Sequence, residues 1–228
     1  MVYFNQMKHP VSFELEFKEN TYPGKFIVIE GIEASGKTTQ AELLVKKLEK
    51  ENKVFHTKNP TNSFIGEVIR KNLLSGETKV PPIALQYLFS ADREIQQQEI
   101  IESLKKGEIV VSDRYFWSSV AYGAADIEID YDNSVNISLT AFSLLSMYHQ
   151  FILPDITFYL NISVAEAENR INASDKHREI YDNSKTNEKV KKGYDWLIEK
   201  FPEQFTFIDA GRSVDEISQN LLGVVSKK

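Results

Sequence analysis

The sequence predicts a three-layer α/β fold, in which helices cover both faces of a parallel five-stranded β-sheet. Two observations lead to this fold class. Short apolar runs alternate along the chain with longer stretches whose apolar residues recur three and four positions apart, which is the pattern of strands connected by helices. The chain has 228 residues, of which 42% are hydrophobic, so one such domain with a substantial core accounts for its length.

The chain begins with residues 1–24, which we expect to form an N-terminal extension to a domain spanning residues 25–228. Apolar and polar residues alternate over residues 11–17, and this pattern predicts a short edge strand. Tyrosine, proline and glycine at 22–24 then predict a turn before the first strand of the sheet.

The five strands of the sheet are predicted from short apolar runs that are bounded by polar or turn residues. They occupy residues 26–29, 53–57, 108–113, 156–160 and 205–209. Because helical patterns separate them, the strands are expected to run parallel, and ligands bind at the carboxyl ends of the strands in such sheets.

The helices are predicted from apolar residues at helical spacing together with capping signals. Ser63 is a candidate N-cap, and Pro81 and Pro82 start the longest helix. Residues 123–132 are expected to form a loop, and the polar residues near 172–183 either an ordinary connection or a lid. The expected helices begin near residue 39 and cover residues 63–76, 81–107, 139–150, 164–171, 189–201 and 214–225.

The composition excludes several classes of function. A net charge of −6 argues against a general nucleic-acid binder, whose affinity comes from clustered basic residues. The chain has no cysteine, which rules out disulfide bonds and thiolate chemistry. No apolar run approaches the length of a membrane span, and the first residues lack the core of a signal peptide. We therefore expect a cytoplasmic protein that binds neither nucleic acid nor membranes.

A glycine-rich motif, Gly-x-x-x-x-Gly-Lys-Thr, lies between the first strand and its helix. The glycines let successive backbone N–H groups point at a phosphate, and the helix N-terminus adds the positive end of its dipole. An exposed Lys37 is expected to reach the β- and γ-phosphates of a nucleoside triphosphate, and Thr38 to bind Mg²⁺. A chance match is the alternative, but the strand–turn–helix context argues against it. The expected triphosphate-binding residues are Gly31, Ile32, Glu33, Ala34, Ser35, Gly36, Lys37, Thr38 and Thr39.

The motif refines the fold class to that of the P-loop NTPases. Asp113 ends an apolar strand that should lie near the loop, and a carboxylate there can order Mg²⁺ through water beside Thr38. An aspartate at a strand end that only caps a turn is the alternative.

Taken together, the motifs resemble those of the thymidylate kinases, a family of nucleoside-monophosphate kinases. The matching residues are Glu33 in the P-loop, Leu88–Arg93, Asp113–Tyr115 and Ser118–Tyr122. The likeness extends from about residue 25 to residue 225. It implies an enzyme that uses ATP and Mg²⁺ to phosphorylate dTMP to dTDP, with these nucleotides as its small-molecule partners. It also implies a homodimer, which is usual in families of this kind.

Phe89 and Arg93 lie four residues apart on the longest helix, so we expect them on one face. A planar base needs a ring and a monophosphate needs a guanidinium group, whereas core packing is the alternative for Phe89. Arg114 follows a buried strand, where it is expected to clamp the acceptor phosphate together with Arg93 and to act in catalysis. A structural ion pair is the alternative for Arg114.

The resemblance implies further roles at the acceptor site. Glu33, exposed by the turn, should accept a hydrogen bond from the 3′-hydroxyl of the acceptor sugar. Tyr122 should lie against the deoxyribose and crowd a 2′-hydroxyl group. Arg70, Ser118 and Ser119 are also expected among the acceptor-binding residues.

The resemblance also places positive charge beside ATP. Arg170 resembles the family arginine that stacks on adenine, with a solvated helical arginine as the alternative. Some members carry an arginine inside the P-loop, where this chain has Ala34 and Ser35. Other members have basic residues on the lid instead, so Arg178 first and Lys176 second are expected to be catalytic, with an ordinary solvated loop as the alternative.

Two positions depart from the family pattern. Lys58-Asn59-Pro60 replaces the common Arg-Glu-Pro, and Gly123 stands where many members have a glutamine, which weakens the expectation of thymine readout. Asn59 also separates two alternatives, because a deoxynucleoside kinase needs a carboxylate base after the second strand and a nucleotide acceptor needs none. A kinase of another nucleoside monophosphate and a binding protein without turnover are further alternatives; the complete set of candidate residues argues against the latter.

Overall fold

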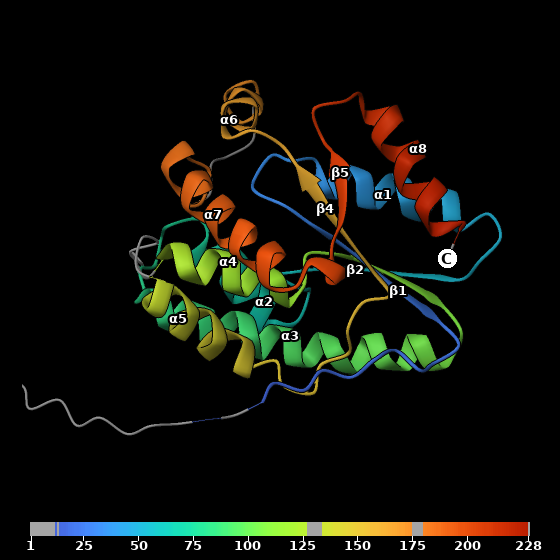
Figure 1. Ribbon diagram of the computed structural model, residues 1–228, viewed down its shortest axis with the longest axis horizontal. Coiled ribbons are helices and arrows are strands. Elements are labelled where there is room, and N and C mark those ends of the chain that lie inside the picture. Colours follow the sequence, from blue (N-terminus) through green and yellow to red (C-terminus); the bar gives the residue numbers. More distant parts are fainter. Residues whose placement is uncertain (1–11, 13, 127–133, 175–179, 228) are drawn as a thin grey trace, which may run out of the picture.

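The computed structural model describes residues 12, 14–126, 134–174 and 180–227. A parallel sheet runs through its centre (Figure 1), with its strands in the order β2–β3–β1–β4–β5. The strands are β1 (Lys25–Glu30), β2 (Val54–Lys58), β3 (Ile109–Asp113), β4 (Ile156–Asn161) and β5 (Thr206–Asp209). The predicted five-stranded parallel sheet is confirmed, and each strand begins and ends within one residue of its expected bounds.

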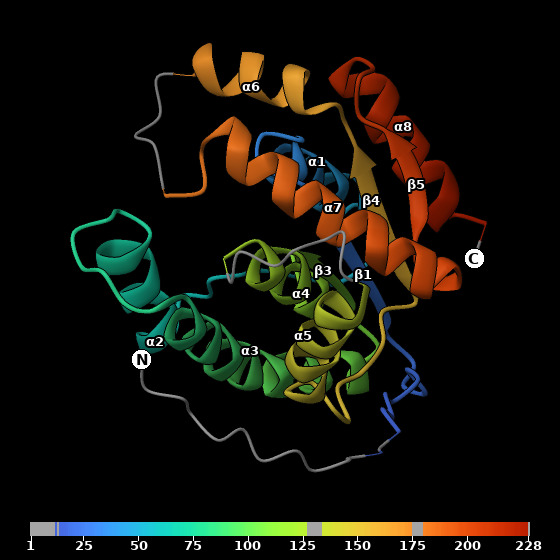
Figure 2. The same cartoon turned by 60° about the vertical axis from the view of Figure 1, so that its left-hand side comes forward.

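The helices of the described residues cover both faces of the sheet. They are α1 (Lys37–Leu48), α2 (Phe64–Val68), α3 (Pro82–Lys105), α4 (Phe116–Asp126), α5 (Ser134–Ser146), α6 (Val164–Asn172), α7 (Ser184–Lys200) and α8 (Val214–Val225), with a π-helical turn η1 (Ile69–Leu73) and a 3₁₀ turn η2 (Pro202–Gln204). α1 and α8 pack together on one face, while α3 and α4, with α5 and α7 packed on them, lie on the other (Figures 1 and 2). The predicted three layers are therefore present.

Local signals explain where several helices begin. Ser63 caps α2 as predicted, because its hydroxyl group accepts a hydrogen bond from Gly66 N at 3.1 Å. Pro82 begins α3, where its missing N–H removes no helical hydrogen bond. Ser213 and Glu216 form a capping box at the start of α8.

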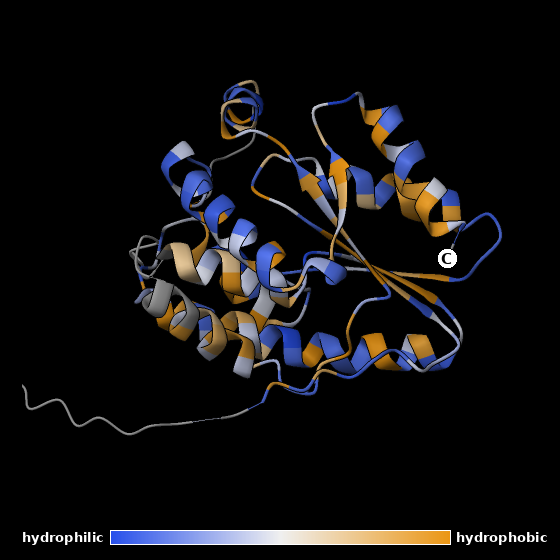
Figure 3. Ribbon diagram, viewed as in Figure 1, coloured by the Kyte–Doolittle hydropathy of each residue, from blue (hydrophilic) through white to orange (hydrophobic). Residues whose placement is uncertain are grey.

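The core lies on both faces of the central strand. Residues 26–29 of β1 are completely buried, and much of the sheet is coloured as hydrophobic in Figure 3. A cluster of aromatic rings continues the core at the start of α4, where Tyr115, Phe116 and Trp117 are fully buried. The Phe116 ring centroid lies 4.8 Å from that of Tyr115 and 4.4 Å from that of Trp117. This packing fixes the backbone immediately after the end of β3.

The prediction of an edge strand at residues 11–17 is wrong for those of them that the structure describes. Their backbone is irregular, and pairing is limited to an isolated bridge between Lys18 and Ile152. The alternation has another cause, since the Phe17 ring stacks on Phe116 with centroids 5.2 Å apart. Leu15 and Phe17 pack against the core without joining the sheet.

Three helix boundaries also differ from the prediction. The loop expected from residue 123 is wrong for residues 123–126, which continue α4; residues 127–133 lie outside the described part. α5 begins five residues earlier than expected and ends at Ser146. α7 begins at Ser184, five residues early, because Asn183 caps it by accepting a hydrogen bond from Thr186 N. Within the described residues, no helix is long and apolar enough to span a membrane.

Candidate active site

A cavity opens at the carboxyl ends of β1, β2 and β3, and its volume of about 870 Å³ is in the range of small-molecule sites. Of the described residues, seven basic and three acidic ones line it, although the whole chain has a net charge of −6. The cavity therefore favours anionic ligands. The charged lining residues are Lys37, Lys58, Arg70, Arg93, Arg114, Arg170 and Arg212, with Glu33, Asp113 and Asp182.

The P-loop between β1 and α1 adopts a backbone conformation that depends on its glycines. Gly31 and Gly36 have φ angles of 152° and 96°, and Ala34 between them has a φ of 58°. A Cβ atom at Gly31 would lie 2.7 Å from Ser35 Oγ, so a larger residue does not fit. No described side chain caps the N-terminus of α1, which leaves its first N–H groups available to a phosphate.

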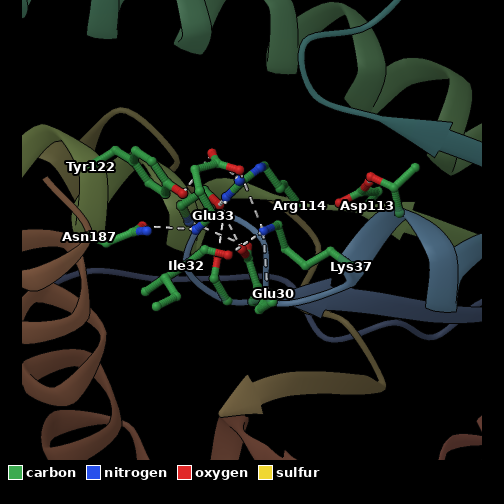
Figure 4. Close-up of polar contacts among 12 residues, drawn as sticks. Glu30, Ile32, Glu33, Lys37, Asp113, Arg114, Tyr122 and Asn187 are labelled. Carbon is green, nitrogen blue, oxygen red and sulfur yellow. Dashed lines mark hydrogen bonds and ion pairs between the residues drawn. The ribbon is translucent and has the colours of Figure 1, made fainter. Parts of the chain in front are cut away.

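Lys37 is the first residue of α1, and its ammonium group folds back over the P-loop (Figure 4). Nζ donates a hydrogen bond to Ile32 O at 2.6 Å and lies 3.9 Å from Glu33 Oε2. Burial, together with the neighbouring charge of Arg114, lowers the pKa of Lys37 from 10.5 to about 8. The expectation of an exposed lysine is wrong, since the side chain is 5% exposed and the backbone of its own loop covers it.

Glu33, Arg114 and Tyr122 form a hydrogen-bonded cluster beside Lys37 (Figure 4). Arg114 Nη2 lies 2.5 Å from Glu33 Oε1, and Tyr122 Oη donates to the same oxygen at 2.9 Å. Burial raises the pKa of the Glu33 carboxyl group, but the charges of Arg114 and Lys37 outweigh this effect and hold that pKa below 4.5. Glu33 is therefore ionised at neutral pH, and it is partly buried where the sequence predicted exposure.

The backbone of Arg114 is left-handed, with a φ of 73°, which is uncommon for a residue other than glycine. Its N–H donates to Ile29 O at 3.0 Å, which ties it to the end of β1. Nη1 donates to Gly31 O and to Ser118 Oγ, each at 3.3 Å. These contacts hold the guanidinium group against the P-loop. Arg114 forms an ion pair with Glu33, which was the alternative to a role in binding the acceptor. The role of Arg114 toward an acceptor stays a prediction.

Glu30, at the end of β1, is a buried carboxylate that sequence reasoning missed. It accepts hydrogen bonds from Ser118 Oγ at 2.6 Å, from Tyr194 Oη at 2.8 Å and from Tyr115 N at 2.9 Å. Burial raises the pKa of the Glu30 carboxyl group, although these hydrogen bonds and the charge of Arg114 oppose the shift. Glu30 joins β1, α4 and α7 beneath the cavity. A charged residue that ends an otherwise apolar strand is the signal that could have revealed it.

Thr38 and Asp113 bring two oxygen atoms together at the floor of the cavity. Thr38 Oγ1 donates to Asp113 Oδ2 at 2.5 Å, and the Asp113 side chain is buried. The described residues contain no group of three or more His, Cys, Asp or Glu side chains that could hold a metal ion. Mg²⁺ needs no such group, because it is usually bound by one or two protein oxygens, substrate phosphates and water. The pair fits this pattern.

Phe89 and Arg93 lie on the same face of α3, as predicted, and both line the cavity. The Arg93 guanidinium carbon is 5.5 Å from the centre of the Phe89 ring, and Nη1 donates to Ser119 Oγ at 2.6 Å. Arg93 is 2% exposed, yet within the described residues it forms no ion pair and its Nε has no hydrogen-bond partner. A buried cation without a counter-ion is unfavourable unless a ligand supplies one.

Arg70 and Asn59 line the opposite wall of the same cavity, beyond the end of β2. Arg70 Nη2 donates to Pro60 O at 2.7 Å and to Thr61 O at 2.6 Å. The Asn59 side chain is buried, and neither of its polar atoms has a hydrogen-bond partner among the described residues. The structure thus places an amide, not a carboxylate, where a nucleoside kinase needs its base.

Arg170 lines the cavity from α6. Nη2 donates to Ala210 O at 2.8 Å and Nε donates to Glu166 Oε1 at 3.2 Å, so the side chain is held against the protein. Stacking on adenine stays a prediction. The two lid residues, Arg178 and Lys176, lie outside the described part of the chain.

Asn187 on α7 is a site residue that the sequence did not suggest. It is completely buried, and its Oδ1 accepts a hydrogen bond from Glu33 N at 3.1 Å (Figure 4). The contact ties the P-loop to a helix 154 positions further along the chain. No local pattern could have indicated it, because a single asparagine in a polar helical stretch looks like a surface residue.

Comparisons with known proteins agree with this geometry. The family model described as thymidylate kinase matches residues 29–221. A probable thymidylate kinase from Methanocaldococcus jannaschii is 36% identical over 200 residues, covering 87% of this chain and 94% of that protein. The thymidylate kinase from Mesoplasma florum is 34% identical over 210 residues, covering 89% and 95%.

A solved structure agrees as well. The thymidylate kinase from Candida albicans superimposes with a TM-score of 0.76 and 28% identity, covering 90% of this chain and 92% of that one. The match of one family model to most of the chain, together with relatives of this similarity along nearly their full length, shows that the chain belongs to the thymidylate kinase family.

Proposed function

We propose that this enzyme transfers the γ-phosphoryl group of ATP to dTMP in the presence of Mg²⁺, giving ADP and dTDP. The observation that carries the proposal is the pair of guanidinium groups of Arg93 and Arg114, which line the same cavity as the P-loop. Arg93 is buried without a carboxylate partner among the described residues, so an anionic acceptor supplies its missing counter-charge. Membership of the family supports the choice of thymidylate as that acceptor.

The donor nucleotide is placed at the P-loop. Backbone N–H groups of residues 31–39 and the start of α1 bind the phosphates, and Lys37 leaves Ile32 O to contact the β- and γ-phosphates. The oxygen atoms of Thr38 and Asp113 would hold Mg²⁺. The metal would supply charge neutralisation to the phosphates there. Arg170 packs on the adenine.

The acceptor nucleotide is placed between α3 and α4. Phe89 stacks on the base, and Arg93 and Arg114 bind the monophosphate. Glu33 accepts a hydrogen bond from the 3′-hydroxyl group, and Tyr122 lies against the deoxyribose. Arg70, Ser118 and Ser119 complete this side, the two serines by contacting Arg114 and Arg93.

The reaction needs positioning and charge neutralisation but no protein base. A phosphate oxygen of dTMP is ionised at neutral pH, so it attacks the γ-phosphorus directly while the bond to the ADP oxygen breaks. The uncharged Asn59 in the cavity wall supports this mechanism over that of a deoxynucleoside kinase, which has to remove a proton from a hydroxyl group. Closure over both nucleotides excludes water, which would otherwise compete with dTMP as the nucleophile.

Removing the Phe89 ring tests the acceptor side. Phe89→Ala is expected to raise KM for dTMP while KM for ATP stays nearly constant, with a loss of about 1–3 kcal/mol by analogy with base–aromatic stacking. Steady-state kinetics with each substrate varied in turn measure both values. A lower melting temperature with unchanged dTMP kinetics would assign the ring to the core instead.

The proposed function is tested by ADP release from the wild-type protein with ATP, Mg²⁺ and a panel of acceptors. We expect turnover with dTMP and none with thymidine. Turnover with thymidine alone would identify a deoxynucleoside kinase, and a preference for another monophosphate would reassign the substrate. ADP release that is the same with and without every acceptor would overturn the proposal.

The proposal also includes a lid, an oligomeric state and a cellular location. We place a lid near residues 172–183 within a kinase domain of residues 25–228, with Arg178 and then Lys176 contacting the transferring group. We also expect a homodimer and a cytoplasmic location. Sedimentation of the purified protein tests whether it is a homodimer.

A further inference from the structure

Tyr148 is a completely buried tyrosine whose hydroxyl group contacts two helices at once. It lies two residues after the end of α5, and it is not one of the residues that line the active-site cavity. Its Oη lies 2.5 Å from Ser119 Oγ on α4 and 2.8 Å from Ser90 Oγ on α3. The ring stacks on Phe116 with centroids 5.5 Å apart, so packing holds the hydroxyl group between the two serines.

The three hydroxyl groups belong to a chain of hydrogen bonds that begins at Arg93. Arg93 Nη1 donates to Ser119 Oγ at 2.6 Å, and a guanidinium group can only donate. At the other end, Ser90 Oγ donates to the backbone oxygen of Gln86 at 2.8 Å. Because the single hydrogen of the Ser90 hydroxyl is used there, Tyr148 donates to Ser90 and Ser119 donates to Tyr148. Each hydroxyl group thus gives one hydrogen bond and receives one.

This chain of hydrogen bonds determines how the Arg93 guanidinium group is held. Among the described residues, Ser119 Oγ is its one hydrogen-bond acceptor, and Arg93 forms no ion pair with any of them. The guanidinium carbon also lies 6.0 Å from the centre of the Tyr148 ring. Ser119 is fixed in turn by Tyr148, and an O–H group that donates becomes a better acceptor. The contact that orients Arg93 therefore depends on the Tyr148 hydroxyl group.

We infer that Tyr148 is a positioning residue for binding of the acceptor phosphate. It lies outside the cavity lining, so it acts through Ser119 on Arg93, whose guanidinium group binds the monophosphate in the proposed function. The inference rests on that proposed function. A guanidinium group that is already oriented loses less conformational entropy when the phosphate binds, so the free energy of binding is more favourable. The turn after α5 consequently contributes to the affinity for the acceptor without touching it.

The test removes the hydroxyl group and keeps the ring. Tyr148→Phe is expected to raise KM for dTMP by about 2- to 12-fold, the range for one net hydrogen bond, while kcat and KM for ATP stay nearly constant. The matched control is Tyr159→Phe, the same change at a buried tyrosine of β4 outside the cavity, and it should leave all three values unchanged. Melting temperatures show that the variants fold.

Ser90→Ala breaks the chain of hydrogen bonds one step further from Arg93 and should also raise KM for dTMP. It replaces Tyr148→Phe as the test if that variant does not fold. In an Arg93→Met background, Tyr148→Phe should weaken dTMP binding no further, because the group that it positions is gone. Calorimetric titration with dTMP measures this binding in variants whose turnover is too slow for kinetics. A further loss of affinity in the double variant would contradict the inference.

A second ligand separates positioning of Arg93 from general damage to the pocket. Thymidine has no phosphate group for Arg93, so Tyr148→Phe should weaken binding of dTMP and leave binding of thymidine unchanged in calorimetric titrations. If both ligands lose affinity by the same factor, or if dTMP binding does not change, the inference is wrong. If the wild-type enzyme does not phosphorylate dTMP at all, the proposed function fails first, which distinguishes the two.

Discussion

Lys37→Met is expected to lower kcat for phosphoryl transfer to dTMP by about 10²–10³-fold or more, the range measured when one preorganised donor to transition-state charge is removed. Nζ is the group of the P-loop that we propose to contact the transferring phosphate, and methionine has a similar length without the charge. The fold should survive, because the side chain is 5% exposed and an uncharged one avoids burying an ammonium group. The measurements are kcat and the melting temperature.

The control for this prediction is Lys46→Met, which removes an exposed lysine from the same helix and should leave kcat unchanged. Turnover of Lys37→Met close to that of the wild type would contradict the role of Lys37. A fall of equal size in both variants would point to a general effect of charge.

Arg114→Met is expected to lower kcat/KM for dTMP by about 30- to 5,000-fold, which corresponds to about 2–5 kcal/mol for truncating one partner of a buried charged contact. The guanidinium group is held by Gly31 O, Ser118 Oγ and the Glu33 carboxylate, so its position relative to the P-loop is set before a nucleotide binds. KM for ATP should change less, because we propose that the loop itself binds most of the donor phosphates.

A second substitution separates this catalytic loss from a loss of stability. Arg114→Met leaves the Glu33 carboxylate partly buried without its ion pair, which should lower the melting temperature. Adding Glu33→Gln removes that charge and should restore much of the melting temperature without restoring kcat/KM for dTMP. If activity returned together with stability, Arg114 would be a structural ion-pair partner only.

The parts of the site that could be predicted are those encoded within one helical turn or one loop. The P-loop carries its own glycines, lysine and threonine in eight consecutive residues, so its conformation follows from local backbone preferences. Phe89 and Arg93 could be placed together because four residues complete about one turn of a helix. The inner strands β1, β3 and β4 were predictable for a related reason, since burial on both faces makes each one largely apolar.

The parts that could not be predicted depend on contacts between distant segments. Lys37 was expected to be exposed, but the backbone at Ile32 and the charges of Glu33 and Arg114 enclose it. Asn187 supports the P-loop from α7 without any motif of its own. Phe17 packs on an aromatic ring of α4, and a period of two does not distinguish such packing from sheet pairing.

The ion pair between Glu33 and Arg114 should weaken the binding of free phosphate to the enzyme. The Glu33 carboxylate pairs with the guanidinium group of Arg114, which a phosphate would also bind. An incoming anion therefore has to displace the carboxylate. Inorganic phosphate could satisfy Arg114 but would leave Glu33 without a partner, whereas a nucleotide brings a phosphate for one and a hydroxyl group for the other. We therefore expect weak inhibition even by millimolar free phosphate, because Glu33 competes as a tethered ligand of high effective concentration.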